Sequence, residues 1–158
     1  MSKANYVGII IGSKNAGITI ITSQNFFFYS MPLYKFYTAD KYFIDYTELA
    51  SVFDKINTNS VVAIQEPTSQ YQTYFSGEIL GAIRAMIIMT AGIEPIMVSK
   101  KQWREHYNDL KNVSIIDTAN KQLVTDHIEE GVSIRLFTIQ DLMIAKSFLI
   151  ALYAKNKF

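Results

Sequence analysis

The chain has 158 residues, of which 49% are hydrophobic and 18% are charged, and its formal net charge is +1. These values fit one globular domain over residues 1–158 and exclude a disordered chain. The absence of cysteine excludes disulfides and cysteine zinc sites, and two histidines leave little for a metal cluster. Without a signal core or a membrane-spanning run, we expect a soluble intracellular protein that is not secreted.

The first apolar run, residues 6–12, predicts the central strand of a sheet. It shows no alternation of polar and apolar residues, which is typical of a strand covered on both faces. Residues 12–17 predict a turn in which Asn15 and Gly17 can adopt positive φ. Two further strands of an antiparallel meander are expected over residues 18–23 and 26–31, and Pro32 ends the second of them.

Residues 26–46 contain ten aromatic side chains, more than one small sheet can bury. They fit a platform for stacking bases, a protein interface, or a core with scattered surface tyrosines. For an interface, the candidates are Tyr34, Phe36 and Tyr37.

Three helices and two strands are predicted over the middle of the chain. A helix over 47–56 is capped by Thr47, and a strand follows over 61–64. A second helix over 76–91 ends at Gly92. The next strand covers 94–98, and Ser99 caps a short basic helix over 100–106.

The helix over 76–91 is apolar around nearly its whole circumference, which indicates burial on more than one side. We expect its own sheet to cover one side and a second subunit or partner protein to cover the other. The residues expected at that interface are Ile79, Ile83, Met86 and Ile87.

A helix over about 114–129 and a last helix ending near Lys155 complete the chain. Thr138 and Asp141 form a capping-box-like start for the last helix. Strands that alternate with helices after an opening meander predict a mixed sheet of about five strands, with helices on both faces. This is an α/β fold with the element order of the ribonuclease H-like group.

Five segments, in order and at matching spacing, resemble one family. They are Gly8–Gly12, Val62–Pro67, Gly81–Met86, Val98–Trp103 and Ala145–Tyr153. Together they resemble the RuvC-like Holliday junction resolvases of the ribonuclease H-like superfamily, which include phage and poxvirus members.

This resemblance implies a DNA-cutting site with two magnesium ions held by four carboxylates. Magnesium requires oxygen ligands, and the two ions activate water and stabilise the leaving oxygen. The matching positions here are Ile10, Gln65, Met143 and Lys146, and none is a carboxylate. The resemblance therefore implies a degenerate member without catalytic residues, metal or other cofactor.

Two neighbouring acids, Glu66 and Asp141, are the candidate substitutes for an active metal nuclease. Glu66 follows Gln65 on a strand, where successive side chains point to opposite faces. Asp141 lies five residues before Lys146, roughly 140° away around the helix. Geometry therefore argues against a site rebuilt from Glu66 and Asp141.

Basic residues offer contacts to DNA phosphates without cleavage. The alternative is a solvated helix face, and for Lys146 an inert side chain in a decayed cleft. The candidates for DNA contact are Lys14, Asn15, Lys100, Lys101, Arg104 and Lys146.

Three functions follow, and the sequence favours the first. It is a catalytically inactive RuvC-like protein that acts through protein contacts or self-association as an assembly component, for example of a phage virion. The second is a nuclease-dead protein that binds DNA or Holliday junctions, and the third is an active junction endonuclease. None of the three involves a membrane or a small-molecule substrate. The protein is expected in the host cytoplasm, or in the virion if a phage encodes it.

Overall fold

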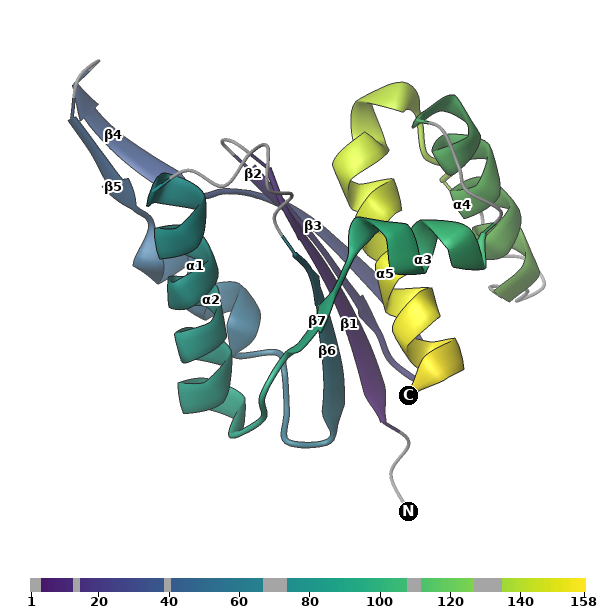
Figure 1. Ribbon diagram of the computed structural model, residues 1–158, viewed down its shortest axis with the longest axis horizontal. Helices are drawn as coiled ribbons and strands as arrows, with labels where there is room; N and C mark the ends of the chain where they lie inside the picture. Colours follow the sequence, from purple (N-terminus) through teal and green to yellow (C-terminus); the bar gives the residue numbers. More distant parts are fainter. Residues whose placement is uncertain (1–3, 13–14, 39–40, 67–73, 108–111, 127–134) are drawn as a thin grey trace.

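The structure of the chain is a computed structural model, which describes residues 4–12, 15–38, 41–66, 74–107, 112–126 and 135–158. A five-stranded mixed sheet forms its centre, with the strand order β3-β2-β1-β6-β7 (Figure 1). β1 is antiparallel to β2 and parallel to β6, so it joins the meander to the parallel part of the sheet. The strands are β1 (Asn5–Ile11), β2 (Asn15–Ile21), β3 (Phe26–Pro32), β6 (Ser60–Gln65) and β7 (Ile96–Val98). The predicted mixed sheet is confirmed.

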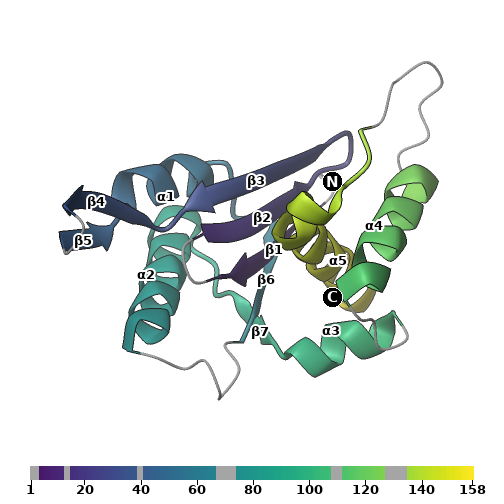
Figure 2. The same ribbon diagram turned by 90° about the horizontal axis from the view of Figure 1, so that it is seen from above.

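Helices cover both faces of this sheet, as predicted. On one face lie α1 (Tyr46–Phe53) and α2 (Tyr74–Ala91), and we call it the α1/α2 face (Figure 1, Figure 2). The other, the α5 face, is covered by α5 (Leu142–Lys157), which a short 3-10 helix (Ile139–Asp141) precedes. Beside α5 lie α3 (Lys100–His106) and α4 (Asn112–Asp126). No helix in the described ranges combines the length and apolar character that crossing a bilayer requires.

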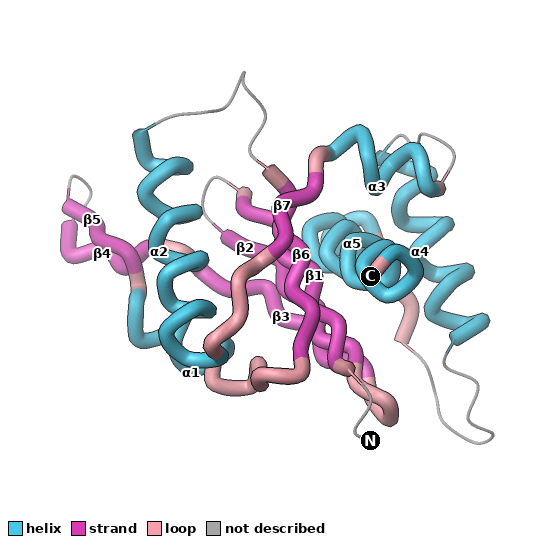
Figure 3. Tube along the Cα trace, turned by 60° about the horizontal axis from the view of Figure 1, so that its bottom comes forward, coloured by secondary structure: helices cyan, strands magenta, loops and turns pink. Residues whose placement is uncertain are grey.

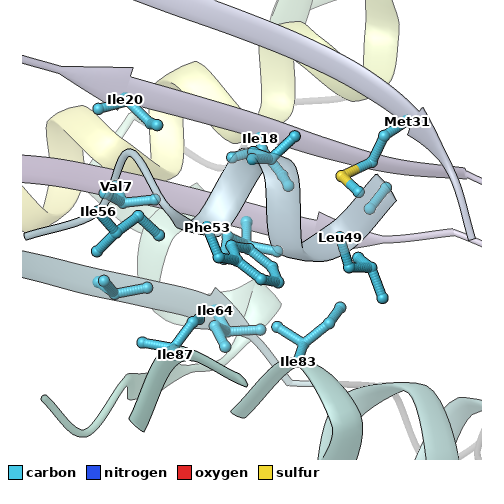
Figure 4. Packing of buried hydrophobic residues seen from close by; sticks show 14 of the residues in the cluster. Val7, Ile18, Ile20, Met31, Leu49, Phe53, Ile56, Ile64, Ile83 and Ile87 are labelled. Atoms are coloured by element: carbon cyan, nitrogen blue, oxygen red, sulfur yellow. The ribbon is translucent and has the colours of Figure 1, made fainter. Parts of the chain in front are cut away.

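Large apolar side chains close the α1/α2 face. Phe53 of α1 lies between the sheet and α2, with Ile64 and Ile83 close to it (Figure 4). Complete burial of such a side chain contributes roughly 1.5–3 kcal/mol. This cluster is therefore a main source of stability. Its fully buried members from the helices include Leu49, Phe53, Ile79, Ile83 and Ile87.

The prediction that α2 presents Ile79, Ile83 and Ile87 to a partner is wrong. All three are buried against the chain's own sheet. Because α2 is apolar nearly all round, its sequence did not distinguish the side facing the sheet from the outer side. Met86 is half-buried at the edge of the core.

Helix ends follow local capping chemistry. The N-cap of α1 is Asp45 rather than the predicted Thr47, since the Asp45 carboxylate accepts a hydrogen bond from Glu48 N (3.3 Å). Gly92 ends α2 with φ of 68°, as predicted, and its N–H donates to the Ile88 carbonyl oxygen (2.9 Å).

Two glycines let α5 lie directly on the sheet. A Cβ on Gly8 of β1 would lie 2.5 Å from the backbone nitrogen of Ala151, and a Cβ on Gly17 of β2 would lie 2.8 Å from the Met143 carbonyl carbon. Both separations are far too short for a side chain. Gly17 was predicted in a turn with positive φ, but it lies within β2 opposite Ile10, because the helix backbone needs that space.

The aromatic segment forms more regular structure than predicted. β4 (Tyr34–Thr38) and β5 (Lys41–Ile44) pair as a separate antiparallel hairpin that projects beyond the sheet (Figure 1). Phe26 and Phe28 of β3 are half-buried on the α5 face, where each packs edge-on against Phe148, with ring centroids 5.4 and 5.7 Å away. The side chains of Tyr34, Phe36 and Tyr37 lie outside the described part.

Candidate nucleic-acid interface

The four positions that match the family's carboxylates converge on the α5 face. In the parallel pair of β1 and β6, Ile9 lies opposite Ile64, so the next residues, Ile10 and Gln65, lie level on the other face. A Cβ on Gly17 would lie 3.2 Å from Ile10 Cγ2 and 2.8 Å from the Met143 carbonyl carbon. Lys146 lies three residues further along α5, on the same side as Met143.

Ile10 is part of a closed apolar core. Its side chain is 4% exposed and belongs to the cluster that α5 forms with the sheet. Met143 packs against the same cluster, and its Cε would be 3.0 Å from a Cβ on Gly12. Two of the four positions therefore supply no side-chain oxygen atom to a cation.

Gln65 has a structural partner. Its Oε1 accepts a hydrogen bond of 2.8 Å from the indole nitrogen of Trp103, whose side chain is fully buried. A buried indole N–H without an acceptor would be costly, so this bond ties α3 to the end of β6. Trp103 was not predicted as a site residue, although it ends the Val98–Trp103 segment that resembles the resolvase family.

Further bonds hold α3 in place beside α5. Ser99 and Gln102 form a reciprocal capping box at its start, with bonds of 2.8 and 3.1 Å. At its other end, the Tyr107 hydroxyl donates to the Leu149 carbonyl oxygen of α5 (3.0 Å). The two helices lie side by side (Figure 3). The positions of the cationic side chains on α3 are thereby fixed relative to α5.

Lys146 lies in a group of cations. Burial, followed by the nearby positive charges of Arg104 and Lys100, lowers the pKa of Lys146 below its ordinary value. The Arg104 guanidinium carbon also lies 5.5 Å from the centre of the Trp103 ring. We call Lys100, Arg104 and Lys146 the cation cluster. The structure thus brings together three residues that were predicted separately to contact DNA.

The other predicted DNA contacts lie apart from this cluster or outside the described residues. Lys101 is exposed on α3 and lies 3.8 Å from the Glu105 carboxylate, an exposed pair that contributes little. Asn15 is exposed at the start of β2. Lys14 lies outside the described residues.

The two acidic residues proposed as substitute metal ligands, Glu66 and Asp141, have local environments that differ from a metal site. Glu66 is exposed just beyond β6, and its backbone N–H donates to the Val98 carbonyl oxygen (2.8 Å). The Asp141 carboxylate accepts bonds from the Thr138 backbone nitrogen (2.9 Å) and hydroxyl (3.2 Å), as expected for a cap. Within the described residues no three acidic, histidine or cysteine side chains form a group that could hold a metal.

The residues at the four positions do not fit a two-magnesium site. Magnesium favours carboxylate oxygens in near-octahedral geometry. Ile10 and Met143 offer no oxygen, Gln65 offers one amide oxygen that is already hydrogen-bonded, and Lys146 brings a positive charge. The side chains at these four positions therefore favour an anion over a metal cation.

No protein-family model and no curated protein matches the sequence. Solved structures do match the fold. RuvC of T. thermophilus in complex with a Holliday junction substrate superposes with a TM-score of 0.61 at 14% identity, over 95% of this chain and 91% of that one. The fold is RuvC-like. A second structure of Thermus thermophilus RuvC gives a TM-score of 0.58 at 12% identity, over 94% and 92% of the two chains.

Proposed function

We propose that this chain is a RuvC-like protein that binds nucleic acid and does not cleave it by metal-dependent chemistry. The observation that carries the proposal is the set of residues at the converging ends of β1, β6 and α5. There, two apolar side chains, an amide and Lys146 stand where a two-metal nuclease needs carboxylates, and Lys100 and Arg104 of the neighbouring α3 add positive charge. We further infer that residues 1–158 act as one domain, which the coverage of 95% supports.

Binding is supported by charge and by structural similarity. Three cations held close together attract a polyanion, and the phosphate backbone supplies most of the non-specific affinity of nucleic-acid-binding proteins. The similar RuvC structure contains a Holliday junction. A branched DNA is therefore the first ligand to test.

Absence of cleavage is supported by the chemistry of the site. A two-metal mechanism needs oxygen ligands that hold both ions and position the attacking water. Lys146 would repel a metal ion from the same space, and its ammonium group can neutralise a phosphate without activating water. The phosphodiester would thus be bound intact.

An assembly role through protein contacts is the second candidate, and one observation favours it. The outer side of α2 carries Ile88 and Met89, which are 42% and 84% exposed. Fewer residues of α2 can contact a partner than the sequence suggested, because Ile79, Ile83 and Ile87 are buried in the chain's own core. In this assembly role the protein would be a component of a phage virion or of a complex in the host cytoplasm.

The experiment measures binding and cleavage of a four-way DNA junction by fluorescence anisotropy and gel analysis. We expect salt-sensitive binding by the wild type and no cleavage with Mg²⁺ or Mn²⁺. The variant Lys100→Ala/Arg104→Ala/Lys146→Ala should bind at least about tenfold more weakly. The variant Lys121→Ala/Lys155→Ala/Lys157→Ala removes three exposed charges elsewhere, and it should bind more tightly than the first variant.

Two outcomes would overturn the proposal. Metal-dependent cleavage that disappears in Glu66→Gln would show an active nuclease with a relocated site. Failure to bind any junction, together with formation of an oligomer that Met89→Lys disrupts, would favour the assembly role.

A further inference from the structure

The cation cluster brings together positive charges from two packed helices. We infer that Lys146, Arg104 and Lys100 bind one backbone phosphate directly, so that nucleic-acid binding at this site needs no divalent cation. The inference rests on the proposed nucleic-acid-binding function, and it adds the ligand group and the independence from metal.

Two helices contribute the three charges. Lys100 and Arg104 are four residues apart on α3, so they lie on the same side of that helix. Lys146 comes from α5, which the bond from Tyr107 to Leu149 holds against α3. A phosphate between the two helices can thus receive hydrogen bonds from both sides.

The arginine is positioned before any ligand arrives. Its guanidinium lies over the Trp103 ring, and the Trp103 indole is fixed by Gln65. A guanidinium that is already oriented loses less conformational entropy when it binds a phosphate. Gln65 is therefore a positioning residue, which acts on the phosphate through Trp103 and Arg104.

The surroundings of Lys146 strengthen its attraction for an anion. Within the described residues Lys146 forms no ion pair with an acidic side chain, and its neighbours in α5, Met143 and Ile144, pack against the apolar cluster of the α5 face. Charges interact more strongly near an apolar surface than in bulk water. Burial is the main cause of the lowered pKa of Lys146, and a bound phosphate would offset the smaller contribution from the positive charges of Arg104 and Lys100.

The sole tryptophan of the chain allows a direct test with inorganic phosphate as the probe. Because Trp103 contacts both Gln65 and Arg104, its indole N–H resonance should shift saturably as phosphate is added at constant ionic strength. EDTA should leave the apparent affinity unchanged. Lys146→Gln should weaken it about tenfold or more, and Lys146→Arg should retain most of it. Lys155→Gln, which removes an exposed charge near the end of α5, should have little effect.

Three results would overturn the inference. They are a requirement for Mg²⁺, equal phosphate titrations for the wild type and Lys146→Gln, or an indole shift in chloride alone of the same size. A spectrum of Lys146→Gln that keeps the dispersion of the wild type excludes misfolding as the cause of a lost response.

Junction binding in parallel separates this inference from the proposed function. If the wild type binds junction DNA and Lys146→Gln binds it equally well, the phosphate site is wrong and the proposed function stands. If phosphate binds saturably and junction DNA does not, the proposed function is wrong and the anion site stands. If both hold, the salt dependence of junction binding should lose about one phosphate contact in Lys146→Gln, a change in logarithmic slope of about 0.9.

Discussion

The two faces of the sheet are built in different ways. On the α1/α2 face, large side chains such as Phe53 and Ile64 fill the space between the sheet and two helices (Figure 4). On the α5 face, Gly8 and Gly17 let the backbone of α5 lie almost directly on the strands. On the α1/α2 face, side chains separate the helices from the sheet. On the α5 face, the backbone of the helix lies directly against the strands.

This difference explains why the candidate site lies on the α5 face. Close approach places the backbone of α5 at Met143 beside Gly17 and Ile10, and Lys146 follows on the same helix. The cationic helix α3 packs against α5. The α1/α2 face contributes stability through the burial of large apolar side chains. The α5 face positions the residues of the candidate site. Two hydrogen bonds, from Trp103 to Gln65 and between Thr19 and Ser147, hold α3 and α5 against the sheet.

A methyl group added to a glycine should separate the faces most strongly. In Gly8→Ala the new Cβ meets the backbone of α5 at Ser147 and Ala151, so α5 must move, and we expect a loss of about 5 kcal/mol or more in the free energy of unfolding. Gly81→Ala on α2 is the matched control, since nothing lies within 4 Å of its Cβ. Higher helix propensity should stabilise that variant by about 0.5–1 kcal/mol. Urea denaturation measures both, and similar effects would show that the contrast between the faces is wrong.

A carboxylate placed at Ile10 tests whether the α5 face is a closed core or an open metal cleft. We expect Ile10→Asp to cost about 3–5 kcal/mol at neutral pH, because the charge is buried without a partner. Ile10→Val should cost about 1 kcal/mol. Ile9→Asp, which places a carboxylate in the fully buried apolar cluster of the α1/α2 face, is the control. Chemical denaturation with and without Mg²⁺ measures the effect, and a rescue of Ile10→Asp alone by Mg²⁺ would contradict the closed core.

A buried hydrogen bond on the α5 face should have a smaller effect. The Ser147 hydroxyl donates to the Ile144 carbonyl oxygen (2.7 Å), so the Thr19 hydroxyl is the donor in its 2.7 Å bond to Ser147. Thr19→Val keeps the shape of the side chain and should cost about 1 kcal/mol. In a double-mutant cycle with Ser147→Ala, we expect a coupling energy of about 0.5–1 kcal/mol. Additive losses would mean that this bond does not help to hold α5.

Local patterns in the sequence predicted the fold well. The unbroken apolar run of β1, the Ser99 cap and the stop at Gly92 each depend on neighbouring residues, and the structure confirms all three. Gly17 was misplaced because its role depends on α5, more than 100 residues later in the chain. Ile79 was misassigned because a helix that is apolar all round carries no signal for which side meets the sheet.

The candidate site was only partly predictable for the same reason. The sequence identified Ile10, Gln65, Met143 and Lys146 by resemblance, and it identified Lys100 and Arg104 as members of a basic helix. It did not predict that α3 would lie against α5, because the bonds from Trp103 to Gln65 and from Tyr107 to Leu149 span 38 and 42 residues. Those contacts place Lys100 and Arg104 of α3 near Lys146 of α5, and the three residues form the cation cluster.

Replacement of Lys146 by methionine should have the smallest effect on stability and the opposite sign. Burial of Lys146, followed by repulsion from Arg104 and Lys100, lowers its pKa in the folded chain, so the charged form of Lys146 opposes folding. Lys146→Met removes that cost and should raise Tm by about 1–3 °C while weakening junction binding. Because the pKa of Lys146 is lowered on folding, the folded protein loses this proton first as pH rises, and the gain in Tm should shrink between pH 7 and pH 10. Scanning calorimetry at both pH values measures this, with the exposed Lys155→Met as the control. A lower Tm for Lys146→Met at pH 7 would mean that Lys146 supports the fold of the α5 face.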